Sequence, residues 1–320
     1  MEHINAEPKQ FSSELVEYRP LTYNEQSLGL THWETIFGFS RDCFERYYSL
    51  AASPDYQVGD TLGAWYQRSL ISTVHICRLK CEWNDEIFLC GGIALVATLA
   101  EYRCHGLSRH LLNLAIEKMK NEGFHFSFLG TDQPGHYAAL DWEESNVPYL
   151  TIKLNEDNAG SMAKWSPFDV CKLIPIYKTR KRPLQFQRSK SYFEHWVGWD
   201  WRRTSAIVNI IDDGYIVLSA PDEEEKRWTV IEWKAPNEDT ENVLFKSAAS
   251  EALKRGTKNL RIDTLPQYLD KQHFRELGHL TEKQNNNIML RNINLPMEKY
   301  KELLQLYESG KAVWWRGDWF

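Results

Sequence analysis

The chain lacks the cysteine and histidine spacings that bind metals or form redox pairs. Its six cysteines include no CxxC pair, and Cys77 and Cys81 stand four residues apart in an expected strand. This pattern is unlike a zinc or dithiol site and is typical of a protein with free thiols in the cytoplasm. Cys104 precedes an expected helix and follows Arg103, an environment that favours a thiolate. We interpret it as a structural loop residue rather than a nucleophile.

Long hydrophobic runs and a strong positive charge are also missing. No apolar run approaches the ~20 residues that span a membrane, and the N-terminus MEHINAEPKQ is unlike a signal peptide. The net charge is -6, which argues against nucleic-acid binding as the main function. The basic run 178–182 is interpreted as a solvated linker or a contact for an acidic neighbour. We therefore expect a cytoplasmic protein with no membrane span and no nucleic-acid partner.

The stretch from Leu95 to Trp142 carries the strongest pattern in the chain. An apolar strand, Ile93–Leu99, is followed by the loop Arg103-Cys104-His105-Gly106-Leu107-Ser108 and then by a helical pattern that ends before Gly123. Free backbone N–H groups from Cys104 to Arg109 and the helix dipole together favour an anion. Because Gly106 has no side chain, a phosphate can approach its backbone closely. The sequence therefore predicts a phosphate site at this helix start.

The type of phosphate site is narrowed by what the loop does not contain. No Gly-Lys-Ser/Thr follows the strand and GxGxxG is absent, so the loop is neither a Walker loop nor a dinucleotide fingerprint. The order Arg-x-x-Gly-x-small, followed by a Tyr in His136-Tyr137-Ala138-Ala139-Leu140-Asp141-Trp142, resembles the GNAT superfamily of CoA-dependent acyltransferases. Two positions differ, since Ser108 replaces a Gly or Ala and Asp141 replaces a Gly.

The GNAT resemblance implies the roles of the residues in this stretch. Residues Arg103, Cys104, His105, Gly106, Leu107, Ser108 and Arg109 would hold the pyrophosphate of an acyl-CoA. The end of the strand, Val96, Thr98 and Leu99, would hold the thioester, with a backbone N–H that polarises its carbonyl. Tyr137 would be the general acid that protonates the leaving thiolate. His105, His110 and His136 fit no common metal spacing, and no metal is expected.

The second half of the chain repeats the element order of the first. A strand hairpin with a turn at Asp212-Asp213-Gly214, a helix ending before Gly256 and the segment His273–His279 parallel the first copy. The fold class is α/β (α+β), with tandem GNAT folds that each contain a mixed, mostly antiparallel sheet flanked by helices. We predict a catalytic domain over residues 1–160, a degenerate second domain over 161–295, and a C-terminal helix and tail over 296–320.

The second copy lacks the residues of the predicted chemistry. An acidic turn without glycine, residues 236–241, replaces the phosphate loop and should repel a pyrophosphate. Phe274 stands where Tyr137 stands in the first copy, so the hydroxyl is missing too. We therefore predict one active and one degenerate copy.

A tandem pair with its active copy first resembles the Eis (enhanced intracellular survival) group of acetyltransferases. Members of that group usually add a sterol-carrier-like domain, which we expect to be missing here. The resemblance implies that the terminal carboxylate, on Phe320, returns to the active site as the base. The aromatic residues before Phe320 would anchor the tail, although a tail merely packed on the surface is the alternative. An acidic residue such as Glu34 is the other candidate base.

The resulting prediction is an acyl-CoA-dependent N-acyltransferase that uses acetyl-CoA or another acyl-CoA as substrate, with acetyl-CoA favoured. Direct attack by a primary amine is expected, and the acidic, aromatic-rich chain suits a cationic small-molecule or peptide acceptor. One alternative is a long-chain acyl-CoA N-acyltransferase that lipidates a Lys or ornithine of a peptide or a small amine. Another is a non-catalytic acyl-CoA-binding protein. The sequence leaves homo-oligomer formation open.

Overall fold

The computed structural model describes residues 11–48, 55–158, 164–166, 168–221 and 226–320, and it forms two compact units. The first unit comprises residues 1–78 and 91–123, and the second comprises residues 79–90 and 124–320. The long strands β3 (Ser69–Trp83) and β4 (Glu86–Thr98) contribute residues to both units. The turn between them, Asn84-Asp85, has positive φ at both residues, as its composition predicts.

The first unit is built on an antiparallel set of strands. β1 (Glu17–Pro20) pairs with β2 (Thr61–Tyr66), which pairs with the unit's part of β3. The β2–β3 turn places Gln67 and Arg68 at φ 50° and 67°, the backbone of a two-residue hairpin. β2 and β3 therefore form a hairpin.

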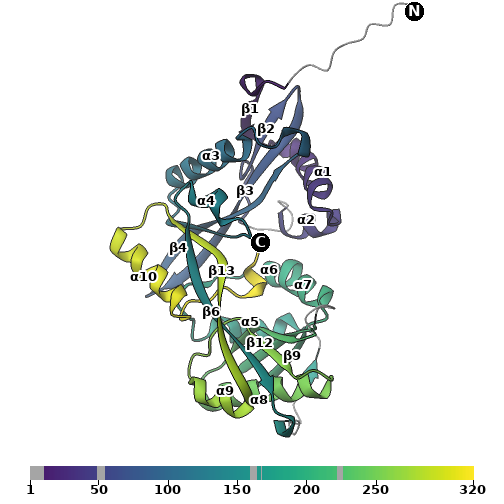
Figure 1. Ribbon diagram of the computed structural model, residues 1–320, viewed down its shortest axis with the longest axis vertical. Helices are drawn as coiled ribbons and strands as arrows, with labels where there is room; N and C mark the ends of the chain where they lie inside the picture. Colours follow the sequence, from purple (N-terminus) through teal and green to yellow (C-terminus); the bar gives the residue numbers. More distant parts are fainter. Residues whose placement is uncertain (1–10, 49–54, 159–163, 167, 222–225) are drawn as a thin grey trace, which may run out of the picture. The chain divides into compact units, whose positions relative to one another are not determined.

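Helices cover the strands of the first unit on two sides (Figure 1). α1 (Gln26–Phe37) and α2 (Arg41–Tyr48) lie on one side, and α3 (Leu107–Asn121) lies on the other. Trp33 of α1 is 1% exposed and packs in a cluster that includes Ala97 of β4. The helix α3 buries the apolar face that the sequence predicts, including Leu111, Ala115 and Met119. It ends before Gly123, whose φ is 75°.

The second unit contains a sheet in which most strands are antiparallel. Its order is β5, β13, β6, β12, β11, β10, β9, β7, and β8 pairs with the unit's part of β3. The bounds are β5 (Phe126–Gly130), β6 (Glu143–Leu154), β7 (Trp165–Ser166), β8 (Gln185–Phe186), β9 (Ile207–Ile211), β10 (Gly214–Ser219), β11 (Trp228–Lys234), β12 (Asn259–Ile262) and β13 (Gly278–Asn292). The pair β11–β12 is parallel.

The two predicted copies exchange strands in this sheet. β13, from the predicted second copy, pairs with β5 of the first copy, placing Leu290 opposite Phe128. β6, from the first copy, pairs with β12 of the second, placing Ile152 opposite Leu260. β6 and β13 also pair with each other along most of their length (Figure 1). The predicted boundary at residue 160 therefore separates strands that belong to one sheet.

The sheet of the second unit has an apolar core on each face. Along β10, Ile216 and Leu218 belong to one buried cluster, whereas Tyr215 and Val217 belong to another, because successive side chains point to opposite faces. The first cluster contains α8 (Glu238–Lys254) and α9 (Lys271–Leu277). The second contains α5 (Val170–Lys178), α7 (Gly198–Arg203) and a π-helical turn, Phe193–Val197, that follows α6 (Lys190–Tyr192). α10 (Met297–Glu308) packs against β6 and β13.

These elements confirm the predicted fold class, a mixed sheet flanked by helices. Across the described ranges, no helix is long and apolar enough to cross a membrane.

Candidate active site

The predicted phosphate loop lies in the first unit and leads directly into α3. A short 3-10 helix, Ala100–Tyr102, ends β4, and Cys104 and Gly106 then take φ values of 65° and 76°. Gly106 is the residue that precedes α3, and it has no side chain with which to cap this helix start. The first N–H groups of an α-helix have no acceptor inside the helix. A helix start of this kind can bind an anion.

The left-handed backbone explains why glycine occupies position 106. A Cβ atom added there would meet no described atom within 4 Å, so space does not require glycine. The φ of 76° at Gly106 does require glycine, because the left-handed backbone region is unfavourable for residues with a side chain. Leu107 is buried and fixes the first turn of α3 to the unit. The loop is therefore rigidly anchored on one side and open on the other.

The charge around this helix start favours an anion. Arg103 and Arg109 are exposed, and Arg103 Nε donates to the carbonyl of Thr98 at 3.2 Å. This bond holds the arginine beside the loop rather than extended into solvent. The helix dipole adds positive potential at the same place.

The strand before the loop contains a bulge that sequence reasoning missed. Leu95 has φ 51° inside β4, a left-handed backbone of the kind that disrupts a strand ladder at a bulge. Thr73 Oγ1 donates to the Leu95 carbonyl at 2.9 Å, and Trp33 Nε1 donates to Thr73 Oγ1 at 2.9 Å. Leucine rarely adopts positive φ, so nothing in the residue types predicts this bulge.

The end of the strand restricts which N–H could polarise a thioester. The Leu99 N–H donates to the Ile71 carbonyl at 3.0 Å, so it is not available for that role. The Thr98 hydroxyl is hydrogen-bonded to Ser72 Oγ at 2.7 Å. The irregular backbone at Leu95 and Val96 is therefore the better candidate for the polarising group.

Tyr137 lies in the second unit, on the short helix α4 (Pro134–Ala138). Its ring is half-buried and contacts Trp142 edge-on, with ring centroids 6.2 Å apart. Burial raises the pKa of Tyr137 to about 12. Its hydroxyl makes no hydrogen bond with any other residue that the structure describes. Tyr137 is therefore protonated at neutral pH and its proton is free to be donated.

The C-terminal tail is also part of the second unit. Val313 and Trp315 are fully buried, and the ring of Phe320 packs edge-on against Phe128 of β5 with centroids 4.9 Å apart. Trp314 lies 5.8 Å from the Phe320 ring. The aromatic residues thus anchor the tail, as predicted.

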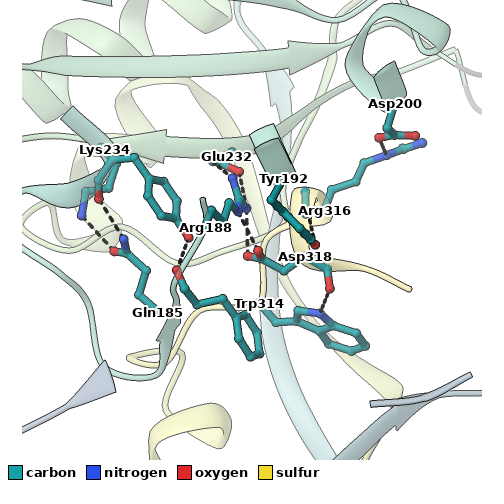
Figure 2. Close-up of polar contacts among 12 residues, drawn as sticks. Gln185, Arg188, Tyr192, Asp200, Glu232, Lys234, Trp314, Arg316 and Asp318 are labelled. Atoms are coloured by element: carbon teal, nitrogen blue, oxygen red, sulfur yellow. Dashed lines mark hydrogen bonds and ion pairs between the residues drawn. The ribbon is translucent and has the colours of Figure 1, made fainter. Parts of the chain in front are cut away.

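A buried ion cluster, which the sequence analysis missed, fixes the tail to the sheet (Figure 2). Arg188 donates to both oxygens of Asp318 in the tail at 2.7 and 2.8 Å, and to both oxygens of Glu232 in β11 at 3.1 and 2.9 Å. The side chains of these three residues are at most 1% exposed. Tyr215 donates its hydroxyl to Glu232 at 2.6 Å. We name these four residues the tail clamp.

Further contacts around the tail clamp hold the backbone of the tail. Tyr192 Oη donates to the Gly317 carbonyl at 3.0 Å, and Trp314 Nε1 donates to the Asp318 carbonyl at 3.1 Å (Figure 2). Arg316 pairs with Asp200 of α7 at 3.2 Å. A Cβ atom on Gly317 would lie 2.8 Å from Arg188 Nη2, so the tail backbone passes too close to the guanidinium for any side chain.

A cleft lies between β6, β13, the chain after β12 and the tail. Its empty space, which is open to solvent, is about 510 Å³. Asp263 and Arg261 form an ion pair in its wall, and burial raises the pKa of Asp263. The aromatic residues lining it are Tyr149, Trp314 and Trp319.

The helix α8, the predicted second copy's counterpart of α3, has a start that is capped by a side chain. Asn237 accepts the N–H of Thr240 at 2.9 Å and thereby caps α8. The buried carboxylate of Glu241 accepts the N–H groups of residues 267, 268 and 269, each at 2.7 Å. Phe274, at the position of Tyr137, is fully buried in the core. Asn237 thus uses one N–H of this helix start, and Glu241 binds backbone donors of residues 267–269.

Other candidates from the sequence have structural partners. Glu34 accepts the N–H of Arg41 at the start of α2 at 3.3 Å, and His110 stacks on Tyr18 at 3.9 Å. In the basic run, Lys181 pairs with the acidic side chain of Glu82. Arg182 is 3% exposed and donates to the carbonyl of Leu265 at 2.8 Å. No group of metal-binding side chains occurs among the described residues.

Comparison with known proteins defines the class of the first half. Residues 17–145 match the family model described as the acetyltransferase (GNAT) domain, so the predicted resemblance to this superfamily is confirmed. This part of the chain is therefore similar to the GNAT transferase domain. No curated protein sequence matches the chain.

Solved structures match the fold over most of the chain. A GCN5-related N-acetyltransferase from Kribbella flavida is 17% identical, with a TM-score of 0.63 over 87% of this chain and 71% of its own. Eis1 from Mycobacterium abscessus is 13% identical, with a TM-score of 0.62 over 87% and 74%. A GCN5-related N-acetyltransferase from Anabaena variabilis is 15% identical, with a TM-score of 0.62 over 87% and 73%. The fold predicted from the resemblance to the Eis group is therefore confirmed.

Proposed function

We propose that this protein transfers an acyl group, with acetyl favoured, from acyl-CoA to a primary amine. The observation that carries the proposal is the start of α3, where Gly106 takes a left-handed backbone beside Arg103 and Arg109. A pyrophosphate carries the charge and the acceptor oxygens that such a helix start binds. The N–H groups of residues 104–109 would hold it, with Arg103 as a positive neighbour.

The thioester would lie along the end of β4. A backbone N–H near the bulge at Leu95 and Val96 would donate to the thioester carbonyl and stabilise the negative charge that develops there during attack. The Trp33–Thr73 hydrogen bonds hold the bulge in place. The thioester is also proposed to contact Thr98 and Leu99. Because the Leu99 N–H is already hydrogen-bonded, these contacts would involve other groups of the two residues.

Tyr137 is the proposed general acid. A neutral amine attacks the carbonyl carbon, the C–S bond breaks, and the thiolate takes the phenolic proton. Because burial raises the pKa of Tyr137 to about 12, it is protonated before reaction but is a weak acid. Proton transfer must therefore accompany C–S cleavage rather than precede it.

The base must remove the proton of the acceptor's ammonium group, so that the neutral amine can attack. The predicted role of Phe320 requires a free carboxylate on this residue, and its anchored ring supports a fixed position for that group. Glu34 is a weaker candidate because its carboxylate already accepts the N–H of Arg41. Extending the chain beyond Phe320 by two residues should lower kcat and leave donor binding unchanged.

The proposal is tested by calorimetric binding of acetyl-CoA, a long-chain acyl-CoA and free CoA. Gly106→Glu should abolish binding, because it places a carboxylate at the phosphate site. Gly123→Glu is a matched control at the other end of α3, since its φ is 75° and its Cβ position is equally open. Both variants carry the same backbone strain of about 1 kcal/mol, so only the position of the charge differs.

The outcomes separate the candidate functions. Tight acetyl-CoA binding, lost in Gly106→Glu and kept in Gly123→Glu, supports the proposal and justifies screening cationic amines by thiol release. A strong preference for the long-chain donor would indicate a lipidating enzyme, and binding without turnover on any amine would indicate an acyl-CoA-binding protein. If no CoA species binds, the proposal is wrong.

A further inference from the structure

An aromatic cluster lies directly beside the phosphate loop in the first unit. The ring of Phe11 contacts His105 at 4.5 Å, Tyr66 at 5.0 Å and Tyr102 at 5.2 Å between centroids. Tyr66 and Tyr102 lie 6.0 Å apart. We name these four residues the aromatic platform.

The residues of the aromatic platform come from three separate segments. Phe11 precedes the 3-10 helix Ser13–Leu15, which has no buried residue. Tyr66 ends β2, and Tyr102 and His105 flank Arg103 in the phosphate loop. The N-terminal segment is therefore brought to the loop by aromatic contacts rather than by a helix that packs in the core.

The aromatic platform is buried at one residue and accessible to a ligand at the other three. Tyr66 is 5% exposed and forms the buried base. Phe11 and Tyr102 are half-buried, and His105 is exposed. Large aromatic rings that remain accessible beside a charged loop offer a stacking surface for a planar ligand.

We propose that the aromatic platform stacks the adenine base of the acyl-CoA donor. This inference rests on the proposed function, since it takes the pyrophosphate to sit on the N–H groups from Cys104 to Arg109. In CoA, only a ribose separates the adenine from that pyrophosphate. His105 belongs both to the phosphate loop and to the aromatic platform, so a base joined through one sugar reaches the rings. Stacking on aromatic side chains suits any nucleobase, because every base has a π-face.

The proposal predicts an effect that depends on the adenosine part of the donor. Phe11→Ala should weaken acetyl-CoA binding about 5- to 100-fold, the range for loss of one base–aromatic stack. The Kd should rise and kcat/KM should fall by this factor. S-acetyl-pantetheine, which lacks the adenosine and the pyrophosphate, should react equally well with the wild type and the variant. Phe11→Trp should keep the acetyl-CoA affinity, because it retains a large ring.

Fluorescence gives a second measurement that does not need turnover. The etheno-adenine derivative of CoA should lose fluorescence on binding the full-length wild type, as its base stacks, and should keep it on binding Phe11→Ala. Tyr23→Ala is the control, because Tyr23 is an aromatic residue of the same unit that is 68% exposed and lies outside the aromatic platform. It should behave as the wild type.

Other outcomes overturn the inference. An equal loss with acetyl-CoA and S-acetyl-pantetheine would mean that Phe11 only supports the fold of the loop. Tighter acetyl-CoA binding by Phe11→Ala would mean that Phe11 blocks the donor site. Unchanged affinity and fluorescence would remove the aromatic platform from recognition while leaving the proposed function intact. If the wild type binds neither CoA nor its etheno derivative, both proposals fail.

Discussion

Replacing Arg188 should destabilise the protein far more than replacing a typical surface cation. Arg188→Met would leave Glu232 and Asp318 buried without their shared guanidinium, and the side chains of all three residues are at most 1% exposed. Removing one partner of a buried ion pair costs about 3–5 kcal/mol, because the remaining charge stays in a medium of low polarity. The expected loss is therefore a large part of the about 5–15 kcal/mol that stabilises an ordinary domain.

In the tail clamp, loss of the cation should destabilise the protein more than loss of one carboxylate. One guanidinium faces two carboxylates, so the cluster has an excess negative charge, and burial raises the pKa of Asp318 to about 6. A neutral side chain at this position is therefore tolerated, and Asp318→Asn should cost about 1–2 kcal/mol through the lost hydrogen bond to Arg188. In the Arg188→Met background, Asp318→Asn should instead stabilise, because it removes one of two unpaired charges.

Urea unfolding at pH 7, followed by tryptophan fluorescence, measures these free energies. Trypsin cleavage after Arg316 reports separately on release of the tail. Lys190→Met is the control, since Lys190 is 67% exposed and pairs with Glu194 only at 3.7 Å, a contact that contributes under about 1 kcal/mol. If Arg188→Met costs no more than Lys190→Met, the tail clamp does not hold the tail.

The remaining predictions concern turnover and pH. Tyr137→Phe should lower kcat about 100-fold or more with donor binding unchanged, and an equal rate in stopped-flow thiol release would remove Tyr137 from the mechanism; Tyr23→Phe is the control. Lys234 is 3% exposed, and burial lowers its pKa from 10.5 to about 7. Between these values the unfolded chain binds the extra proton, so this group makes stability rise with pH from 7 to 10.5, by at most about 1.4 kcal/mol per pH unit. Lys234→Met should flatten the unfolding free energy over this window and stabilise the protein below pH 7; an unchanged slope would contradict this account.

Local patterns in the sequence were sufficient for the phosphate loop. The apolar strand, the glycine before an amphipathic helix and the glycine after it are features of neighbouring residues, and the structure shows Gly106 and Gly123 in the left-handed backbone. The hairpin turns at Asn84-Asp85 and Asp212-Asp213 were predictable for the same reason. Tyr137 was found through the resemblance, and its role stays a prediction.

The bulge at Leu95 and the tail clamp were not predictable in this way. Leucine has no intrinsic preference for positive φ, so only the hydrogen bond from Thr73, 22 positions away in the chain, shows why the strand is irregular there. Arg188 and Asp318 are separated by 130 positions. Their pairing depends on burial against Glu232, which no local pattern encodes.

The sequence by itself determined the element order, the helix and strand periods and the loop that opens α3. These follow from steric preferences and side-chain spacing within about ten residues. Only the tertiary structure decided that β6 and β13 are exchanged between the copies and that a buried cation holds the tail. Both depend on which strand edges and charges remain unsatisfied once the chain is compact, because backbone donors, carboxylates and guanidinium groups taken out of water must find partners wherever in the chain they lie.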